Sequence, residues 1–459
     1  MPGEEHVVPA IEVKLLAADV KSDAVSLDVL DIVARCEKTG ALTEVDVTRL
    51  FDVRGADFSY VVEQADQLRQ HVNGDAVSYV VNRNINYTNV CYFKCQFCAF
   101  SKGKQSENLR GRPYDITGED IAQRCSEAWS RGATEVCMQG GIHPDYTGQT
   151  YLDIVNTVRS ATPGMHIHAF SPLEVWQGAA TLGVTVPAFL RQLRQAGLNT
   201  LPGTAAEILH DEVRANLCPD KLNTEQWLEV MAASHDAGLR TTATIMYGHI
   251  DRPRHWAAHL LHIRALQQRT GGFTEFVPLP FVHMEAPMYL KGKARRGPSF
   301  REAILMHAVA RLVFNGLIAN IQASWVKMGK EGVAACLKAG VNDLGGSLMN
   351  ESITRAAGSG HGQEWVPEQI EAQIHAAGRQ PRMRTTLYGD AAQERRDAAL
   401  NAAPLSDVFG ASAAKKQRSK RLSVIEKPLD APDTLEVKWI HESHDRTVYE
   451  SVVLMAACN

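Results

Sequence analysis

The chain has 459 residues, of which 45% are apolar and 22% are charged, and its formal net charge is −4. This length accommodates one large barrel with extensions as well as two or three domains, and the apolar fraction is sufficient for a large buried core. The weakly acidic balance gives no electrostatic reason to expect a nucleic-acid or membrane partner.

The sequence features that bear on cellular location are membrane helices, signal peptides and cysteine pairing. No apolar run in the sequence reaches the ~20 residues of a membrane helix, and the N-terminus MPGEEHVVPAIEVK lacks the basic start and apolar stretch of a signal peptide. Nine cysteines, three of them clustered, are unlike the disulfide framework of a secreted protein. The sequence therefore predicts a cytoplasmic protein without membrane attachment.

The first segment, residues 1–75, is expected to be a helical N-terminal extension. Apolar residues recur at helical spacing in SLDVLDIVARC and again in VVEQADQLRQHV. No residue pattern in this segment indicates chemistry, so its predicted role is structural.

From residue 76 to 388 the pattern changes to short β-rich runs separated by helical ones such as VPAFLRQLRQAG and EAILMHAVARLVFNG. The candidate strands are VSYVVNRNIN, TEVCMQG, HIHAFS, NTLPG, RTTATIMYG, FTEFVPL, ANIQAS and NDLGG. Eight such runs alternating with helices predict an α/β fold with a parallel TIM-type (β/α) barrel, closed or partial. In such barrels the C-terminal ends of the strands carry the active site.

Residues 389–459 form the third predicted region, a linker and C-terminal extension of unknown role. Residues 390–425 are rich in Ala and charged residues and predict a solvated linker, and the last residues could form a small β element.

Three cysteines gather in NINYTNVCYFKCQFCAF, directly after the first candidate strand. Cys91, Cys95 and Cys98 have the spacing C-x3-C-x2-C. Three thiolates from one loop can ligate three irons of a 4Fe-4S cluster, and the open fourth iron can then bind S-adenosylmethionine (SAM). Phe97 could pack against the cluster and the adenine, although simple core packing explains it equally well. The pattern predicts a radical SAM enzyme whose cofactors are a 4Fe-4S cluster and SAM.

Other interpretations of these cysteines belong to a different class of protein, either an iron–sulfur electron-transfer protein or a zinc-binding structural protein. A zinc site normally needs a fourth Cys or His at ligand spacing, and neither residue occurs between Cys98 and Cys125. The three could also be ordinary buried thiols. The remaining cysteines are scattered and are interpreted as small apolar side chains: Cys36, Cys125, Cys137, Cys218, Cys336 and Cys458.

Further segments carry a resemblance to a known family over about residues 57–390. They are NRNINYTNVCYFKCQFCAF, EVCMQGGIHP, MHIHAFSPLEV, PGTAAEIL, MYGHIDRPRHW, GGFTEFVPLPFVH and NDLGGSLMNESI. Together they resemble the tyrosine-cleaving subunit of FO synthase, the CofH family, which is equivalent to the C-terminal half of the fused enzyme FbiC. The menaquinone-pathway enzymes aminofutalosine synthase and dehypoxanthine futalosine cyclase belong to the same group and remain alternatives.

The resemblance implies a transferase reaction. L-tyrosine is cleaved between Cα and Cβ, and its 4-hydroxybenzyl fragment is joined to C5 of 5-amino-6-(D-ribitylamino)uracil. The product, 5-amino-5-(4-hydroxybenzyl)-6-(D-ribitylimino)-5,6-dihydrouracil, leads to the deazaflavin coenzyme FO. Only one cysteine cluster is present, so the cyclising CofG-type subunit is expected to be a separate chain. An electron donor such as flavodoxin or ferredoxin is also expected.

The resemblance and the strand ends suggest the cofactor-binding residues. Gln139, Gly140 and Gly141 follow a β run, and glycines there let the backbone approach the amino-acid part of SAM closely; a tight turn would need the same glycines. Glu207 follows another strand and could bind the SAM ribose or amino group, or could simply favour a helix N-terminus. Ser171 ends the HAFSPLEV strand and is a further candidate.

Candidate catalytic residues lie on two other strands. His166 and His168 alternate on one strand, so both lie on one face of it. Tyr247 and His249 alternate in the same way near the end of another strand. We expect these four to face the lumen and to hold tyrosine or the diaminouracil, although packing against helices would explain them too. Asp343, with its neighbour Asn342, is expected at the end of the last strand.

Overall fold

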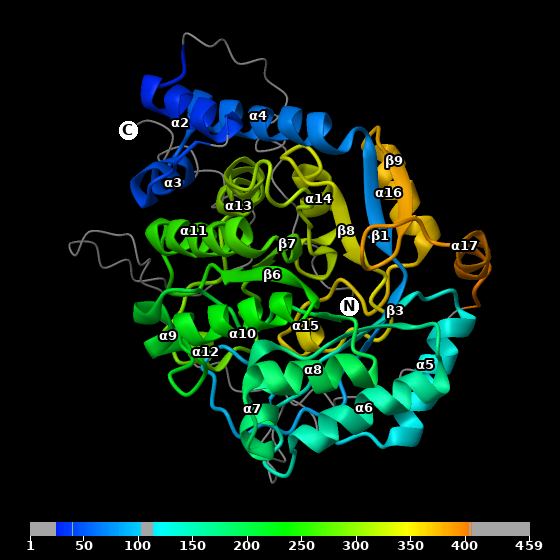
Figure 1. Cartoon of the computed structure of the whole chain (residues 1–459). Helices are drawn as coiled ribbons and strands as arrows, with labels where there is room; N and C mark the ends of the chain where they lie inside the picture. The colour runs from blue at the N-terminus through cyan, green and yellow to red at the C-terminus, as the bar shows by residue number, and fades with distance from the viewer. Residues whose placement is uncertain (1–23, 39, 102–112, 404, 406–459) are drawn as a thin grey trace, which may run out of the picture. The chain divides into compact units, whose positions relative to one another are not determined.

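The fold was analysed in a computed structural model, which describes residues 24–38, 40–101, 113–403 and 405. Within these residues the strands lie in the order expected (Figure 1). They are β1 (Ala76–Val80), β2 (Asn82–Ile85), β3 (Glu135–Met138), β4 (His166–Ala169), β5 (Thr200–Leu201), β6 (Arg240–Tyr247), β7 (Phe273–Pro280), β8 (Asp343–Gly346) and β9 (Gln380–Arg384).

The strands follow one another round a parallel ring. One sheet has the order β2-β3-β4-β5-β6-β7 and a second has the order β8-β1-β9. Residues 321–322 connect the two sheets, since Ile321 bridges Phe276 of β7 and Gln322 bridges Asp343 of β8. The first and last candidate strands meet as β1 and β8, and the predicted TIM-type barrel is confirmed.

Helices that follow the strands cover the ring. They are α5 (Gly118–Ser130), α6 (Gly148–Ala161), α7 (Pro172–Leu182), α8 (Val186–Ala196), α9 (Asp211–Leu217), α10 (Thr224–Asp236), α11 (Pro253–Thr270), α12 (Pro287–Leu290), α13 (Phe300–Val313), α14 (Trp325–Cys336), α15 (Ile353–Ala356) and α16 (Pro367–Ala376). The strand residues that face them, such as Val136, Ile167 and Phe276, are fully buried. In the described part of the chain, no helix is long and apolar enough to cross a membrane.

Local sequence signals set the ends of these helices. Thr117, Ser171 and Ser299 precede α5, α7 and α13, and each forms a capping box with the acidic residue three positions later. Gly183 and Gly197 end α7 and α8 with positive φ angles of 65° and 117°, a conformation that costs glycine little. These caps fix where each of these helices begins or ends.

The N-terminal region forms the helices α2 (Leu27–Glu37), α3 (Glu44–Phe51) and α4 (Gly55–Asn73). α3 packs on α11 and α13, and α4 packs on α13. Their buried faces, including Val29, Leu50 and Val61, join the main hydrophobic core. This arrangement agrees with a structural role for the region.

The chain after residue 389 differs from the expected linker. Residues Gln393–Leu400 form helix α17, which packs on α5 through Arg395. The Arg395 guanidinium lies 4.2 Å from the Trp129 ring and donates to the Trp129 carbonyl at 2.8 Å. Gly132 allows this approach, because a Cβ there would lie 2.5 Å from the backbone of α17. The polar sequence of this segment did not indicate a packed helix. The β element predicted near the C-terminus lies outside the described residues.

The floor of the barrel, at the N-terminal ends of the strands, is closed by a buried ionic network. Arg384 at the end of β9 donates to both oxygens of Asp343 in β8, at 2.5 and 2.9 Å. Its guanidinium also lies 3.3 Å from Glu275 in β7. Ser78 in β1 donates to Asp343 at 2.5 Å, and the Tyr388 hydroxyl donates to Glu275. Four separate chain segments therefore meet in one polar cluster inside the ring.

The buried helix α13 makes stability depend on pH. Its His307 is fully buried and donates from Nδ1 to the Ala303 carbonyl at 2.7 Å, and burial lowers the pKa of His307 to about 4. An unfolded histidine titrates near 6.5, so acidification protonates the unfolded state first and stability falls as pH falls below ~6.5. Between pH 7.5 and 5.5 this residue alone should cost about 1 kcal/mol. Urea titrations at both pH values should therefore show a smaller pH effect in His307→Leu.

Candidate active site at the barrel mouth

The loop after β2 brings three cysteines to the mouth of the barrel. Cys91, Cys95 and Cys98 are free and partly exposed. Burial raises the pKa of Cys91 and of Cys95, and a negative charge on Cys98 adds to the rise, so the three groups interact. Their sulfur atoms are not among the described groups of three donors within 4.8 Å of one another. A structural zinc site normally has four Cys or His ligands, whereas three thiolates from one loop can ligate three irons of a cubane cluster and leave the fourth iron open.

Backbone contacts fix the cysteine loop on three sides. The Tyr92 N–H donates to the Ile142 carbonyl at 3.1 Å, and the Gln96 N–H donates to the Leu217 carbonyl at 3.0 Å. In return, the Gln96 carbonyl accepts from the Met288 N–H at 2.8 Å. The loop is thus held by the segment after β3, by the last residue of α9 and by α12, which fixes its position at the mouth.

A buried ammonium group compensates the negative charge expected at this loop. Lys221 lies 3.0 Å from the Glu207 carboxylate and 5.1 Å from the centre of the Phe97 ring. Burial raises the pKa of Cys95 to about 12, while the charge of Lys221 opposes this rise. A fixed positive charge near three thiolates lowers the electrostatic cost of assembling them.

The glycine turn after β3 lies directly against the cysteine loop. A Cβ at Gly140 would lie 2.3 Å from the Tyr87 ring, and one at Gly141 would lie 2.3 Å from the Val90 carbonyl oxygen. The Gly140 N–H donates to the Glu174 carboxylate at 3.2 Å. Both glycines are therefore required for close packing of the turn on the loop, which is a reason beyond the expected approach to SAM.

Of the other predicted cofactor residues, Ser171 and Gln139 lie at this turn, whereas Glu207 lies in the loop after β5. Ser171 donates to the Glu174 carboxylate at 2.6 Å and caps α7, so its hydroxyl is engaged within the protein. Gln139 lies 3.7 Å from the Cys137 sulfur and its carbonyl accepts from Asn86 at 3.2 Å. Glu207 ends the loop after β5 with a positive φ of 46°. Tyr87 also donates to Glu174, which links the turn to the cysteine loop.

This packing gives a prediction for Gly141→Ala. The new methyl group would also lie 2.9 Å from the Cβ of Cys91, so the cysteine loop must shift. Because backbone cannot move aside cheaply in a packed site, we expect iron content after anaerobic reconstitution to fall well below that of the wild type. Gly118→Ala is the control, since a Cβ there meets nothing closer than 3.7 Å. Equal iron content in both variants would contradict this account.

The two histidines of β4 meet one threonine. Nε2 of His166 lies 2.8 Å, and Nδ1 of His168 lies 2.7 Å, from the Thr200 hydroxyl of β5. Burial lowers the pKa of His166 to about 4, against the opposing charge of Glu135 in β3. His168 is 7% exposed, and burial also lowers its pKa. Both side chains are thus neutral near pH 7 and lie in a polar stretch of the lumen.

The structure corrects the expected orientation of Tyr247 and His249. Along β6, Met246 is partly exposed and packs on the small cluster that includes Leu217 and Phe281, so its neighbour Tyr247 points to the other face. Tyr247 is fully buried and its ring packs edge-on against Trp256 of α11 at 5.8 Å. The structure does not bring these residues together with His166 and His168.

His249 stabilises the turn that joins β6 to α11. Its Nε2 lies 3.0 Å from the Met246 carbonyl, and its Nδ1 lies 3.0 Å from Asp251. Burial raises the pKa of Asp251, but His249 and the Gly248 N–H outweigh this effect and hold it below its usual value. A fully buried imidazole with these partners is a structural element. Strand alternation placed His249 on the same face as Tyr247, but β6 ends at Tyr247 and His249 lies in the turn after it.

Asp343 and Asn342 are also placed differently from expectation. Asp343 is the first residue of β8 and binds Arg384 at the floor, so it lies at the opposite end of the strand from the mouth. The side-chain oxygen of Asn342 accepts from the Ile321 N–H at 2.9 Å and from the Arg311 guanidinium at 2.6 Å. Both residues hold strands together.

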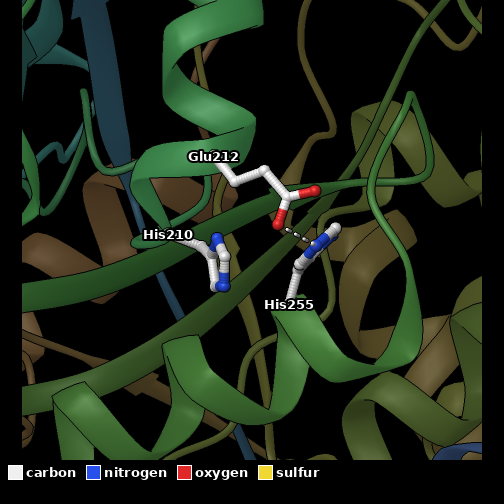
Figure 2. Close-up of side chains that lie close together, drawn as sticks. All are labelled: His210, Glu212 and His255. Atoms are coloured by element: carbon white, nitrogen blue, oxygen red, sulfur yellow. Dashed lines mark ion pairs between the residues drawn. The ribbon is translucent and has the colours of Figure 1, made fainter.

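A second cluster of possible ligands lies outside the barrel, between α9 and α11 (Figure 2). Donor atoms of His210, Glu212 and His255 lie within 4.8 Å of one another. Nδ1 of His255, however, accepts from the Arg252 N–H at 3.1 Å, so Nε2 carries the proton and offers no lone pair. Glu212 also binds the Arg254 guanidinium at 2.9 Å. Helix capping and an ion pair account for this cluster without a metal.

Sequence reasoning missed several residues of the site. Lys221 and Lys327 come from segments without a recognisable motif, and only folding brings them to the mouth. Glu135 and Thr200 begin short strands, and their alternation with buried apolar neighbours could have identified them as lumen residues.

Comparisons of the sequence with known proteins agree with this geometry. Residues 85–262 match the radical SAM superfamily, and residues 270–396 match the CofH/MqnC C-terminal region. A 5-amino-6-(D-ribitylamino)uracil–L-tyrosine 4-hydroxyphenyl transferase of Methanopyrus kandleri is 48% identical over 328 residues, which cover 72% of this chain and 88% of that protein. An FO synthase of Streptomyces avermitilis is 48% identical over 358 residues, 78% of this chain. The chain spans only 41% of that enzyme's length.

Comparisons of the structure support the fold alone. Methylornithine synthase matches 76% of this chain with a TM-score of 0.60 and 18% identity. The FeFe-hydrogenase maturase HydG matches 82% of the chain with a TM-score of 0.62 and 15% identity. The matched regions cover 97% of methylornithine synthase and 78% of HydG.

Proposed function

Because this chain belongs to the CofH family of radical SAM 5-amino-6-(D-ribitylamino)uracil–L-tyrosine 4-hydroxyphenyl transferases, we propose that it catalyses that transfer. L-tyrosine would be cleaved between Cα and Cβ, and its 4-hydroxybenzyl fragment would be joined to C5 of the diaminouracil. The observation that carries the proposal is the 48% identity to a transferase of this name over 88% of its length. The three free cysteines at the barrel mouth support it.

In this proposal Cys91, Cys95 and Cys98, which are free and lie in one loop, hold a 4Fe-4S cluster. When bound, the cluster and SAM supply the 5′-deoxyadenosyl radical. Phe97 and the Gln139–Gly141 turn lie on the side of the mouth where SAM would bind. Ser171 acts there by positioning Glu174, and Glu207 offers its second carboxylate oxygen while the first binds Lys221.

The lumen below would hold the organic substrates. His166 and His168 are neutral, and their ring nitrogens share the Thr200 hydroxyl. This group can exchange hydrogen bonds with the ribityl hydroxyls or the tyrosine phenol without adding charge. The ring of strands excludes bulk water, which protects a reactive radical from side reactions.

The proposed partners follow from the same family. The reductive cleavage of SAM needs an electron, so we expect a donor such as flavodoxin or ferredoxin. The product must still be cyclised, and a CofG-type radical SAM barrel is the expected partner. The described residues contain one cysteine cluster of this kind. Thiolates held for a metal require a reducing compartment, so a cytoplasmic location is proposed.

The proposal can be tested by anaerobic turnover. Reconstituted enzyme is incubated with SAM, a chemical reductant, L-tyrosine and 5-amino-6-(D-ribitylamino)uracil, and products are read by mass spectrometry. The expected product is the diaminouracil carrying a 4-hydroxybenzyl group at C5, together with 5′-deoxyadenosine. Enzyme that ignores tyrosine but acts on an enolpyruvyl-benzoate substrate would instead be a menaquinone-pathway relative.

A further inference from the structure

Lys327 occupies an unusual position at the barrel mouth. It is the third residue of α14 and follows the short strand segment 321–322 almost immediately. Its side chain is partly exposed. The charges that act on it come from Glu207, after β5, and Glu351, after β8. Lys327 therefore lies where α14 begins at the mouth, within electrostatic reach of carboxylates that follow two other strands.

The first turn of α14 is built to hold this lysine in place. Trp325 donates to the Gly346 carbonyl of β8 at 2.8 Å, and the Val326 carbonyl accepts from Ser359 at 2.6 Å. Gly329 then breaks the helix with φ 64° and ψ 179°. Lys327 lies between these anchors, so its backbone is fixed relative to the ring.

The carboxylates near Lys327 are already committed to other partners. Glu207 forms an ion pair with Lys221 at 3.0 Å. Glu351 is 3% exposed and accepts from the Thr354 N–H at 2.7 Å, which caps α15. No hydrogen bond or ion pair joins the Lys327 ammonium to another described residue. Burial of this group lowers its pKa, so the ammonium is incompletely solvated and lacks a close anion.

We propose that Lys327 binds the α-carboxylate of the amino-acid substrate, L-tyrosine. The inference rests on the proposed function and identifies a specificity-determining residue within it. The diaminouracil carries no carboxylate, so the anionic candidates are tyrosine and SAM. The cysteine loop and the turn at Gly140 follow β2 and β3, whereas Lys327 comes from the segment between β7 and β8; Glu207, after β5, lies between these two sectors of the ring. An ion pair there would orient Cα and the amino group toward the lumen.

The test uses reconstituted, SAM-loaded enzyme and equilibrium binding of L-tyrosine and of tyramine, which lacks the carboxylate. Lys327→Met keeps most of the side-chain stem and removes the charge. Because a charge-assisted hydrogen bond contributes about 1.5–3 kcal/mol, tyrosine affinity should fall about 10- to 100-fold. Tyramine affinity should stay nearly constant, and Lys327→Arg should retain most of the preference for tyrosine. Lys330→Met, on the exposed side of the same helix, is the control.

The outcomes separate this inference from the proposed function. Wild-type enzyme that does not bind tyrosine at all contradicts both. Wild-type and Lys327→Met enzymes that bind tyrosine equally well refute the role of Lys327 and leave the function intact. Loss of SAM binding in Lys327→Met, seen as an unchanged cluster spectrum on SAM addition, would assign the lysine to the SAM carboxylate and overturn the inference. A folded Lys327→Met variant is recognised by an iron content equal to that of Lys330→Met.

Discussion

Replacing Cys91, Cys95 or Cys98 by Ala is expected to abolish the formation of 5′-deoxyadenosine from SAM. Each substitution removes one of three ligands, and a cubane bound through three protein thiolates has no spare ligand in this loop. Iron content after anaerobic reconstitution should fall from about four irons per chain toward zero. Iron and sulfide assays, together with chromatography of the SAM products, measure both effects.

A matched control separates this effect from a general loss of cysteine. Cys125 is fully buried in α5, and Ala at that position removes a single sulfur from the core. Cys125→Ala should reconstitute like the wild type. Stoichiometric zinc in the wild type, without iron uptake, would overturn the interpretation of all three ligands.

The barrel was predictable because its strands have two local signals. Most candidate runs contain β-branched residues and most end in a polar residue or glycine, and all eight runs correspond to strands or to the bridging segment at Ile321. The cysteine spacing was equally local, since three ligands lie within eight residues. Patterns of this kind can be recognised from the sequence alone, because residues close together in the chain determine them.

The polar contacts inside the barrel were not predictable in the same way. Asp343 was assigned to the mouth because the end of a strand cannot be located within a short run. Tyr247 was assigned to the lumen because a one-residue shift of register reverses every side chain. Lys221, Lys327 and Arg384 depend on contacts between segments far apart in the sequence. Long polar side chains at such positions look like surface residues until the fold is known.

Replacing Arg384 by Met is expected to cause the largest loss of stability among single changes in the barrel floor. The guanidinium is 2% exposed and binds Asp343 at 2.5 and 2.9 Å, with Glu275 at 3.3 Å. Met fills a similar volume but leaves two buried carboxylates without their cation. Breaking a buried pair in this way costs about 3–5 kcal/mol, and thermal unfolding under anaerobic conditions should begin several degrees earlier.

The same strand provides the control that identifies burial as the cause. Arg382 pairs with Asp390 at 2.7 Å, but their side chains are 41% and 74% exposed. Exposed pairs contribute about 0–1 kcal/mol, so Arg382→Met should unfold almost like the wild type.

The loss of stability in Arg384→Met should also depend on pH. Burial raises the pKa of Glu275 to about 7 even though Arg384 opposes the rise. Without Arg384, Glu275 should take up a proton more readily, so the defect of Arg384→Met should be smaller at pH 6 than at pH 8. Adding Glu275→Gln to Arg384→Met should recover part of the lost stability at pH 8, because one unpaired buried charge is removed. Equal unfolding temperatures for Arg384→Met and Arg382→Met would show that the floor network does not stabilise the barrel.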